Sequence, residues 1–353
     1  MSCTKGLAMR AHVALRRLAP ALLFAALLWS FSAPALHAQG PYKVLDHWKL
    51  SDAGGWDYLL VDSTAHRVYI TRGDHVDAID STSGKLLGTI TGLHGTHGVA
   101  LNPDGKTGYI SDGRGNAVIV FDRSTFSVTA TIPAGTNPDA IIWEPATKSV
   151  WAFNGRSNDI TVIDADSRKV IATIPVPGKP EFAVSDGKGS LYNNIEDKNE
   201  IVKIDVRSHK ITATWPACES PSGLALDPAG NRLFAVCDGK KMSVLDATSG
   251  KVLATPAIGD GPDAAAYSAK NKLAFASCGE GVLSVIDASA SDYKTIQTLP
   301  TKRGARTMTY DPATDRIYTV TADFGPPPAA TADNPRPRPA MLPGTFEVIV
   351  IGR

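Results

Sequence analysis

The stretch Trp151-Ala-Phe-Asn-Gly-Arg-Ser-Asn-Asp-Ile-Thr-Val-Ile-Asp164, followed by Arg168-Lys-Val-Ile-Ala-Thr-Ile174, has the pattern of three short β-strands. An apolar run at 151–154 leads into a turn cluster of Gly, Ser, Asn and Asp at 155–159. β-Branched and smaller residues then alternate at 160–164 and again at 170–174, as they do in strands. Because related stretches follow one another along the chain, this repeat decides the fold.

An apolar strand that precedes the quoted pattern recurs seven times, at intervals of 40 to 43 residues. The seven copies are Asp57-Tyr-Leu-Leu-Val61, His97-Gly-Val-Ala-Leu101, Asp139-Ala-Ile-Ile-Trp143, Glu181-Phe-Ala-Val-Ser185, Ser222-Gly-Leu-Ala-Leu226, Asp263-Ala-Ala-Ala-Tyr267 and Arg306-Thr-Met-Thr-Tyr310. A repeat of about 41 residues is typical of a β-propeller with four strands in each blade.

The order of elements within each unit supports this interpretation. A turn such as Asn102-Pro-Asp-Gly105 follows the first strand, and the third strand ends on an acid, as at Ile163-Asp164. The seventh unit lacks a fourth strand, and Tyr42-Lys-Val-Leu-Asp-His-Trp48 resembles the fourth strands of the other units. The sequence therefore predicts an all-β fold, a seven-bladed β-propeller with four antiparallel strands per blade, closed in its last blade by the N-terminal strand. We expect residues 39–353 to form a single domain.

A Pro-rich insertion at 323–344 interrupts the repeat in the last blade. Its Pro, Ala and Arg content favours extended polyproline conformation. A loop of this length inside a compact domain is usually either a lid over a site or disordered, and the sequence leaves both open.

The N-terminal residues 1–38 have the pattern of a secretory signal peptide. Arg10, Arg16 and Arg17 precede an apolar stretch at 18–31, and small residues suited to cleavage follow. A retained membrane anchor is the alternative, but the apolar run is shorter than the roughly 18–20 residues that a span needs. No later run is long and apolar enough to span a bilayer, so we expect a periplasmic or secreted protein.

Composition and cysteine content are those of an ordinary globular protein. The chain is 43% hydrophobic and 20% charged, with a formal charge of +1, which does not indicate bulk attraction to nucleic acid or anionic membrane. Cys218 precedes the first strand of the fifth blade and Cys237 ends its second, so antiparallel pairing favours a Cys218–Cys237 disulfide. A Cys237–Cys278 bridge is the alternative. The absence of a Cys-x-x-Cys pair argues against a haem attachment site or a zinc ribbon.

The stretch Ala152-Phe-Asn-Gly-Arg-Ser-Asn-Asp-Ile-Thr-Val-Ile-Asp164, with Lys169-Val-Ile-Ala-Thr-Ile174, resembles the YVTN-repeat, or YncE-like, β-propeller family. That family's repeat runs approximately Tyr-Val-Thr-Asn, then Ser-Asn, Val-Ser-Val-Ile-Asp and Lys-Val-x-x-Thr-Ile. The resemblance covers nearly all of the chain after residue 41. It implies an exported seven-bladed propeller and supplies no catalytic motif.

Propeller topology places the starts of the seven first strands around one mouth of the central channel. The residues at these starts are Asp57, His97, Asp139, Glu181, Ser222, Asp263 and Arg306. The loops between second and third strands lie on the same face and add Arg114, Asn154 and Arg156, whereas the opposite face carries plain turns. We therefore predict that the ligand-binding residues are Asp57, His97, Asp139, Glu181, Asp263, Arg306, Arg114, Asn154 and Arg156. Of two flanking aromatics, Tyr58 is expected to pack under the blade and Trp56 to form a wall or cover the rim.

Three interpretations of this mouth remain open: a hydrated rim without ligand, a small-molecule or peptide site, and a divalent-metal site. Oxygen ligands from Asp139, Glu181 and Asp263 would suit a hard cation such as calcium. Adding His97, with or without His94 or His75, would favour a transition metal. Metal-dependent lactonases with propeller folds provide an analogy at the level of fold only.

The leading hypothesis is an exported binding or scaffold protein, more in keeping with a non-enzyme, that takes an unknown small molecule, peptide or protein at the charged mouth. The alternative is a metal-dependent hydrolase or lactonase with a divalent cation held by His97, Asp139, Glu181 and Asp263. Interleaved carboxylates and the lack of a stacking series argue against nucleic acid as the partner. We expect a monomer.

Overall fold

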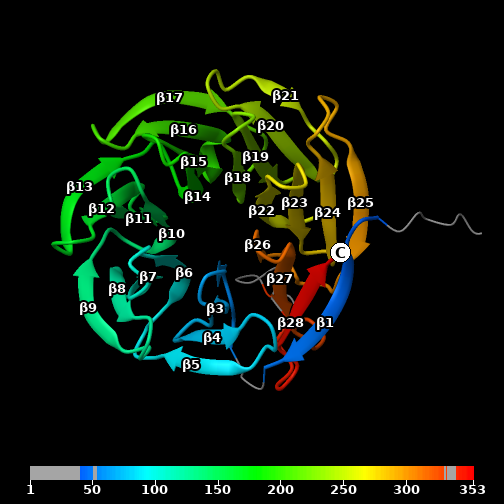
Figure 1. Ribbon diagram of the computed structural model, residues 1–353, viewed down its shortest axis with the longest axis horizontal. Helices are drawn as coiled ribbons and strands as arrows, with labels where there is room; N and C mark the ends of the chain where they lie inside the picture. Colours follow the sequence, from blue (N-terminus) through cyan, green and yellow to red (C-terminus); the bar gives the residue numbers. More distant parts are fainter. Residues whose placement is uncertain (1–39, 51–53, 330, 332–338) are drawn as a thin grey trace, which may run out of the picture. The chain divides into compact units, whose positions relative to one another are not determined.

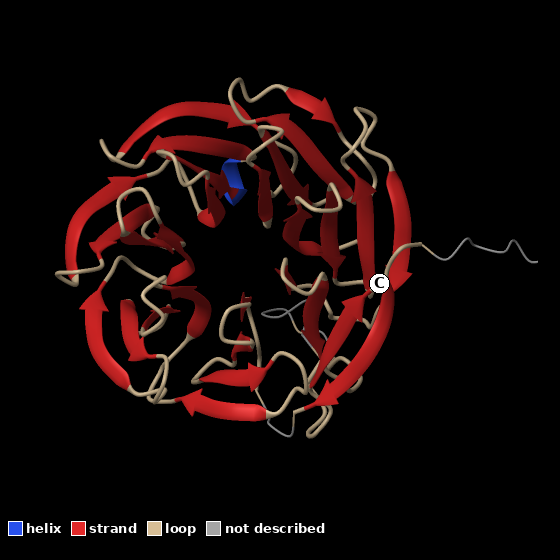
Figure 2. Ribbon diagram, viewed as in Figure 1, coloured by secondary structure: helices blue, strands red, loops and turns tan. Residues whose placement is uncertain are grey.

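Each unit of the repeat folds into one antiparallel sheet, whose two faces can both be covered by neighbouring sheets. The computed structural model describes residues 40–50, 54–329, 331 and 339–353. In this part of the chain the strands form seven four-stranded antiparallel sheets, arranged as a ring around a central channel (Figure 1). The all-β, seven-bladed fold class is thus confirmed. Figure 2 shows one short 3-10 helix, η1 (Glu196–Lys198), between strands that make up the blades.

Six blades take their four strands consecutively from the sequence, with the first strand innermost. Blades 1 to 3 contain β2 (Leu59–Asp62), β3 (Arg67–Thr71), β4 (Val76–Asp80), β5 (Leu86–Ile90), β6 (Thr96–Leu101), β7 (Thr107–Asp112), β8 (Ala117–Asp122), β9 (Val128–Pro133), β10 (Pro138–Glu144), β11 (Ser149–Asn154), β12 (Asp159–Asp164) and β13 (Lys169–Pro175). Blades 4 to 6 contain β14 (Pro180–Ser185), β15 (Ser190–Ile195), β16 (Glu200–Asp205), β17 (Lys210–Pro216), β18 (Leu224–Asp227), β19 (Arg232–Cys237), β20 (Lys241–Asp246), β21 (Val252–Ala254), β22 (Pro262–Ser268), β23 (Leu273–Cys278), β24 (Val282–Asp287) and β25 (Thr295–Pro300).

Blade 7 is assembled from both ends of the described chain. It consists of β26 (Met308–Asp311), β27 (Arg316–Thr321), β28 (Glu347–Gly352) and, outermost, β1 (Lys43–Lys49). β1 pairs antiparallel with β28, from Lys43 opposite Gly352 to Lys49 opposite Glu347. The predicted closure by an N-terminal strand is therefore confirmed, one residue further along than the expected Tyr42–Trp48.

The seam beside blade 7 is packed like an ordinary junction between blades. Trp48 of β1 covers the turn at Gly84 of blade 1, where φ is +71° and an added Cβ would lie 2.4 Å from the indole. Blade 5 repeats this arrangement, with Gly250 at φ +70° beneath Trp215 of blade 4. Glycine is needed at both turns because a side chain would collide with the tryptophan and strain the backbone.

The first strands depart from regular pairing next to the channel. Register shifts interrupt their pairing with the second strands between Thr96 and Val99, Pro138 and Ile141, Pro180 and Ala183, and Pro262 and Ala264. The interrupted segments contain His97, Asp139, Glu181 and Asp263. A β-bulge bends its strand and changes the direction of a side chain, so it can place these polar groups in the channel.

The ring corresponds to one compact unit, Gln39–Arg353. The expected signal peptide at 1–38 lies outside the described residues. The insertion expected at 323–344 lies between β27 and β28, and its residues 330 and 332–338 are also outside the described part. Within the described residues, no helix has the length and apolar character that crossing a membrane requires.

Candidate functional site

A cluster of charged side chains occupies the channel at the starts of the first strands. Asp57 lies next to β2, and His97 and Asp139 lie on β6 and β10. The Nδ1 atom of His97 is 2.6 Å from an Asp57 carboxylate oxygen and 3.6 Å from one of Asp139. Three residues that are distant in sequence thus meet at one point.

Second-strand hydroxyls help to hold these strand starts in place. Thr71 Oγ1 donates to the His97 carbonyl at 3.0 Å, and Ser111 Oγ donates to the Asp139 carbonyl. In both cases the hydroxyl belongs to one blade and the carbonyl to the next. The Asp57 N–H also donates to Thr71 Oγ1, at 3.2 Å, so one hydroxyl joins the backbones of Asp57 and His97 across two blades.

The electrostatic state of this trio is set by burial and by mutual charge. Burial raises the pKa of Asp139 to about 6, with the nearby Asp57 adding to the effect and His97 opposing it. Burial lowers the pKa of His97, but its hydrogen bond to Asp57 and the charges of Asp139, Asp57 and Glu181 outweigh this, so the net pKa is raised. The two neighbouring acids therefore favour the charged form of the imidazole more than water does.

Glu181 forms the next part of the cluster, together with Lys179, which the sequence analysis did not identify. Lys179 Nζ lies 2.6 Å from Glu181 Oε1 and also pairs with Glu196 of η1. Burial, with help from Asp139, raises the pKa of Glu181 to about 8, and Lys179 only partly opposes this. The positive charge of Lys179 therefore does not offset the effect of burial and of Asp139 on the Glu181 carboxyl group.

Asp263 and Arg306 complete the cluster on the side of blades 6 and 7. Arg306 Nη1 is 3.6 Å from Asp263 Oδ1, and Ser222 Oγ donates to the Asp263 carbonyl at 3.2 Å. The other carboxylate oxygen, Oδ2, is buried without a hydrogen-bond partner among the described residues. Burial raises the pKa of Asp263 to about 6 although Arg306 lowers it.

The trio is the arrangement that best suits a cation. Asp57, His97 and Asp139 can each offer one ligand atom, and these atoms lie within 4.8 Å of one another. One imidazole nitrogen and two carboxylate oxygens are ligands that divalent transition metals accept. Of the metal ligands predicted from the sequence, Glu181 and Asp263 instead face the cations Lys179 and Arg306, and Asp57 takes their place.

Two aromatic rings cross the channel beneath the charged cluster. The rings of Tyr58 and Phe182 have centroids 5.4 Å apart, and the Tyr58 hydroxyl donates to Glu181 at 3.4 Å. Tyr58 was expected to pack under the blade, but its phenol instead reaches the acids. Burial, followed by the charges of Asp139, Glu181, Asp57 and Asp263, raises its pKa. The sequence distinguishes Tyr58 and Phe182, because they are the two aromatic residues that directly follow a strand start. The residues that follow the other five strand starts are small: Gly98, Ala140, Gly223, Ala264 and Thr307.

The loop residues predicted for the mouth lie apart from this cluster. Arg114 and Arg156 are exposed on the loops between second and third strands. Asn154 is fully buried, and its Nδ2 donates to Asp159 at 2.6 Å and to Thr161 at 2.9 Å, so it stabilises the end of its own blade.

His94 and His75 do not join His97 either. His94 is largely exposed, with its Nδ1 3.2 Å from Asp112, and His75 Nδ1 lies 2.6 Å from Asp74. Among the described residues, the group with ligand atoms close enough for a metal contains neither of them.

The three described cysteines lie outside the charged cluster. Cys218 and Cys237 are joined by a disulfide with Cα atoms 5.8 Å apart, and Cys278 is a buried free thiol. Burial raises the pKa of Cys278 to about 12, so it is a poor nucleophile.

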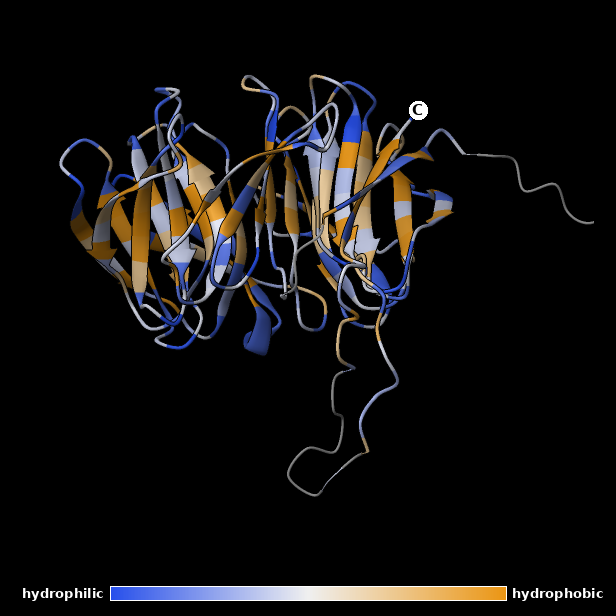
Figure 3. Cartoon of the chain, turned by 90° about the horizontal axis from the view of Figure 1, so that it is seen from below, coloured by the Kyte–Doolittle hydropathy of each residue, from blue (hydrophilic) through white to orange (hydrophobic). Residues whose placement is uncertain are grey.

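The base of the insertion is anchored beside the first blade. Phe324 forms a bridge with Met341, and the Trp56 ring packs 6.1 Å from Phe324 and 5.3 Å from Phe346. Lys302 Nζ forms an ion pair with Asp323 Oδ1 at 2.7 Å. Figure 3 shows the described ends of the insertion leaving the ring on the side that carries η1.

Comparisons with known proteins establish the fold alone. A scan against protein-family profiles found no match, and a search of curated proteins found none. Among solved structures, the chain is similar to "Kuenenia stuttgartiensis Hydrazine Synthase", with a TM-score of 0.67, 18% identity and coverage of 76% of this chain and 93% of that one. It is also similar to "Structure of U3-55K", with a TM-score of 0.71, 9% identity and coverage of 88% and 98%.

Proposed function

We propose that this chain is an exported β-propeller that acts as a binding or scaffold protein and takes a positively charged ligand at the charged channel mouth. The observation that carries the proposal is the excess of acid among the partly buried side chains there. Five carboxylates face two permanent cations and one imidazole: Asp57, Asp139, Glu181, Glu196 and Asp263 against Lys179, Arg306 and His97. Burial, with the charges of neighbouring acids, raises the pKa of Asp139, Glu181 and Asp263, and a bound cation would lower these values again.

Export rests on the signal-peptide pattern at residues 1–38, and membership of the YVTN-repeat family rests on the repeat pattern quoted above. Both are parts of the proposal. They agree with the propeller fold.

The test is calorimetric titration of the purified protein at pH 8 with calcium, manganese, zinc and the organic cation spermidine. The Asp139→Asn and Glu181→Gln variants should each lower the affinity for the bound cation at least tenfold. The matched control is Asp166→Asn, which removes an exposed acid from a turn of blade 3. If no cation binds the wild-type protein, or if Asp166→Asn weakens binding as much as Asp139→Asn does, the proposal fails.

A metal-dependent hydrolase or lactonase is the second candidate, and the Asp57–His97–Asp139 trio favours it. These residues would hold the ion, which would activate a water molecule or polarise a carbonyl group. Glu181, with its pKa of about 8, could hold or release a proton beside the ion. Elemental analysis of the purified protein, followed by lactone and ester hydrolysis assays with added calcium, zinc or manganese, tests this candidate. Protein that holds no metal and gains no activity from these ions would exclude it.

A further inference from the structure

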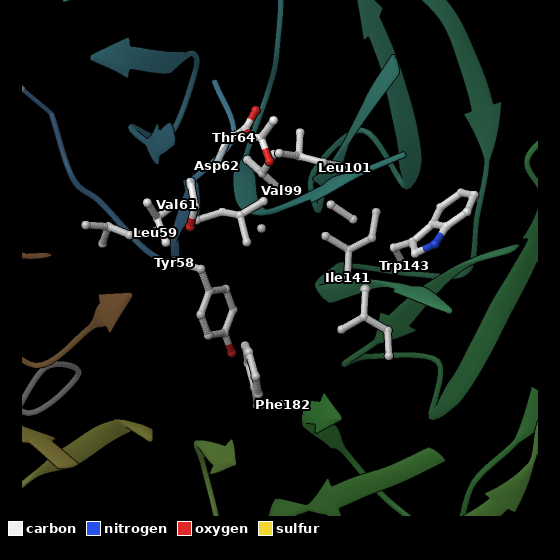
Figure 4. A pocket seen from close by; sticks show the side chains of 15 residues that line it. Tyr58, Leu59, Val61, Asp62, Thr64, Val99, Leu101, Ile141, Trp143 and Phe182 are labelled. Carbon is white, nitrogen blue, oxygen red and sulfur yellow. The ribbon is translucent and has the colours of Figure 1, made fainter. Parts of the chain in front are cut away.

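The half of the channel beyond the Tyr58–Phe182 ring pair differs in chemistry from the charged mouth. A cavity of about 410 Å³ lies there between the first strands of blades 1, 2 and 3 (Figure 4). Its wall includes Leu60, Val99, Leu101, Ile142 and Trp143. Cavities of roughly 300–1,000 Å³ with mainly apolar walls are typical of small-molecule sites.

A second cavity of about 340 Å³ lies between blades 1, 6 and 7. Its space arises from small residues, Gly223 and the run Ala264-Ala-Ala266, where blade 3 carries isoleucines in the equivalent strand. Tyr58, Leu59, Leu60 and Phe182 belong to the walls of both cavities. The two cavities therefore meet at the aromatic pair that separates them from the acids.

The walls offer no unpaired charge. Asp62 is the carboxylate in the wall of the larger cavity, and it is buried and paired with Arg123. The wall of the smaller cavity contains no acid, lysine, arginine or histidine. A charged ligand would thus lose hydration without gaining a partner, whereas an uncharged apolar ligand would lose little.

The apolar wall also has an energetic consequence. Apolar surface in contact with water costs about 25 cal/mol per Å², so a channel that serves only as a water-filled gap has no reason to be lined in this way. Ser63 and Thr64, which line the larger cavity, belong to the turn between β2 and β3 of blade 1. The cavity is therefore reached from the face opposite the charged mouth.

We propose that this apolar half of the channel is a second binding site, for an uncharged, mostly apolar small molecule of the size of a fused-ring aromatic compound or a small terpenoid. The Tyr58 and Phe182 rings form its floor. This site is distinct from the charged mouth, and neither proposal depends on the other.

The test uses 1-aminoanthracene, an uncharged probe at neutral pH whose fluorescence rises in apolar surroundings, titrated into the full protein. We expect saturable binding in the micromolar range. Ile142→Trp, which fills the larger cavity, should weaken binding at least tenfold. Leu60→Asn, which keeps the side-chain size but places an amide in both walls, should weaken it at least fivefold. Ile171→Trp is the matched control, because Ile171 is 51% exposed on the outer strand of blade 3.

Circular dichroism and thermal unfolding identify which variants retain the fold, and either folded channel variant is sufficient for the comparison. Failure of the wild-type protein to bind the probe saturably would overturn the proposal. Equal binding by wild type and by a folded channel variant would also overturn it, since the probe would then sit on the outer surface. Loss of cation binding in Asp139→Asn with unchanged probe binding would show that the two sites are separate.

Discussion

Tyr58 and Glu181 are hydrogen-bonded across the channel, with the phenol of blade 1 donating to the carboxylate of blade 4 at 3.4 Å. The two residues are 123 positions apart in the sequence. Their contact joins the charged cluster to the aromatic floor of the apolar half. One side chain, Tyr58, thereby belongs to both compartments of the channel.

Replacing this phenol by Phe should cost the protein about 1 kcal/mol of unfolding free energy, because the buried carboxyl group of Glu181 loses a hydrogen-bond donor. Urea unfolding of Tyr58→Phe measures the change. Tyr69→Phe is the matched control, since the Tyr69 hydroxyl is buried without a hydrogen-bond partner among the described residues. Removal of the Tyr69 hydroxyl should leave the unfolding free energy unchanged or raise it. Equal destabilisation by the two variants would show that the Tyr58–Glu181 contact contributes nothing.

Stability should fall as the pH rises from about 4.5 to about 8, through the Glu181 carboxyl group. Its folded pKa, about 8, lies above its ordinary value of 4.5 because of burial and Asp139. The folded state therefore binds the proton more tightly than the unfolded state, and the contribution present below pH 4.5 is lost as the pH passes through 8. Asp139 and Asp263 act in the same direction between about 3.8 and 6.

The Glu181→Gln variant should remove that dependence. Relative to wild type it should gain at least about 1 kcal/mol in unfolding free energy between pH 5 and pH 8.5, since one pKa unit corresponds to about 1.4 kcal/mol. Denaturant unfolding at both pH values measures the gain, with the exposed Glu219→Gln as control. Parallel pH profiles for wild type and Glu181→Gln would contradict the raised pKa.

The imidazole of His97 should titrate above 6.5, and its pKa should depend on Asp57. Burial opposes the charged ring, but the Asp57 hydrogen bond and the surrounding acids prevail. Asp57→Asn should therefore lower the pKa of His97, which an NMR titration of the ring protons can follow. Asp74→Asn, which alters the partner of His75 instead, should leave the His97 pKa in place. An unchanged value in Asp57→Asn would exclude the proposed ion pair.

The disulfide between Cys218 and Cys237 closes a short loop in blade 5 and should stabilise the ring. With a sequence separation of 19, the loop-closure argument gives about 3 kcal/mol. The Cys218→Ala/Cys237→Ala double variant should lose this amount in guanidinium unfolding. A reducing agent should destabilise the wild type and have no effect on the double variant. If reduction leaves the wild type unchanged, the bond is absent or contributes nothing.

The fold could be predicted from the sequence because its determinants are local and repeated. The spacing of the apolar first strands gave the number of blades, and the likeness of Tyr42–Trp48 to other fourth strands indicated how the ring closes. The structure confirms the number of blades and the closing strand. Both predictions depend on a repeat spacing that is kept along the chain even where single residues of the repeat differ. The starts of the first strands also drew attention to Asp57, His97 and Asp139, but as members of a ring of seven residues and not as a trio.

The sequence could not predict which side chains pair within the site, because β-bulges determine which residues of the first strands point into the channel. A bulge adds one residue to a strand without a distinctive composition, so the alternation of side chains cannot show which residue enters the channel. Lys179 comes just before Pro180 and was not recognised as the partner of Glu181. Asn154 resembles an exposed loop residue in the sequence but satisfies hydrogen bonds inside its blade.

The strand that closes blade 7 gives the ring a mechanical weak point. β1 and β28 are antiparallel, and Lys43 lies opposite Gly352, so the two outward-leading ends of the chain sit at the same end of the ladder. A pulling force on these ends would open the hydrogen bonds one after another, as in a zipper, instead of shearing them all together. Tension would thus release β1 first and expose the edge of β28, while the other six blades kept their strands.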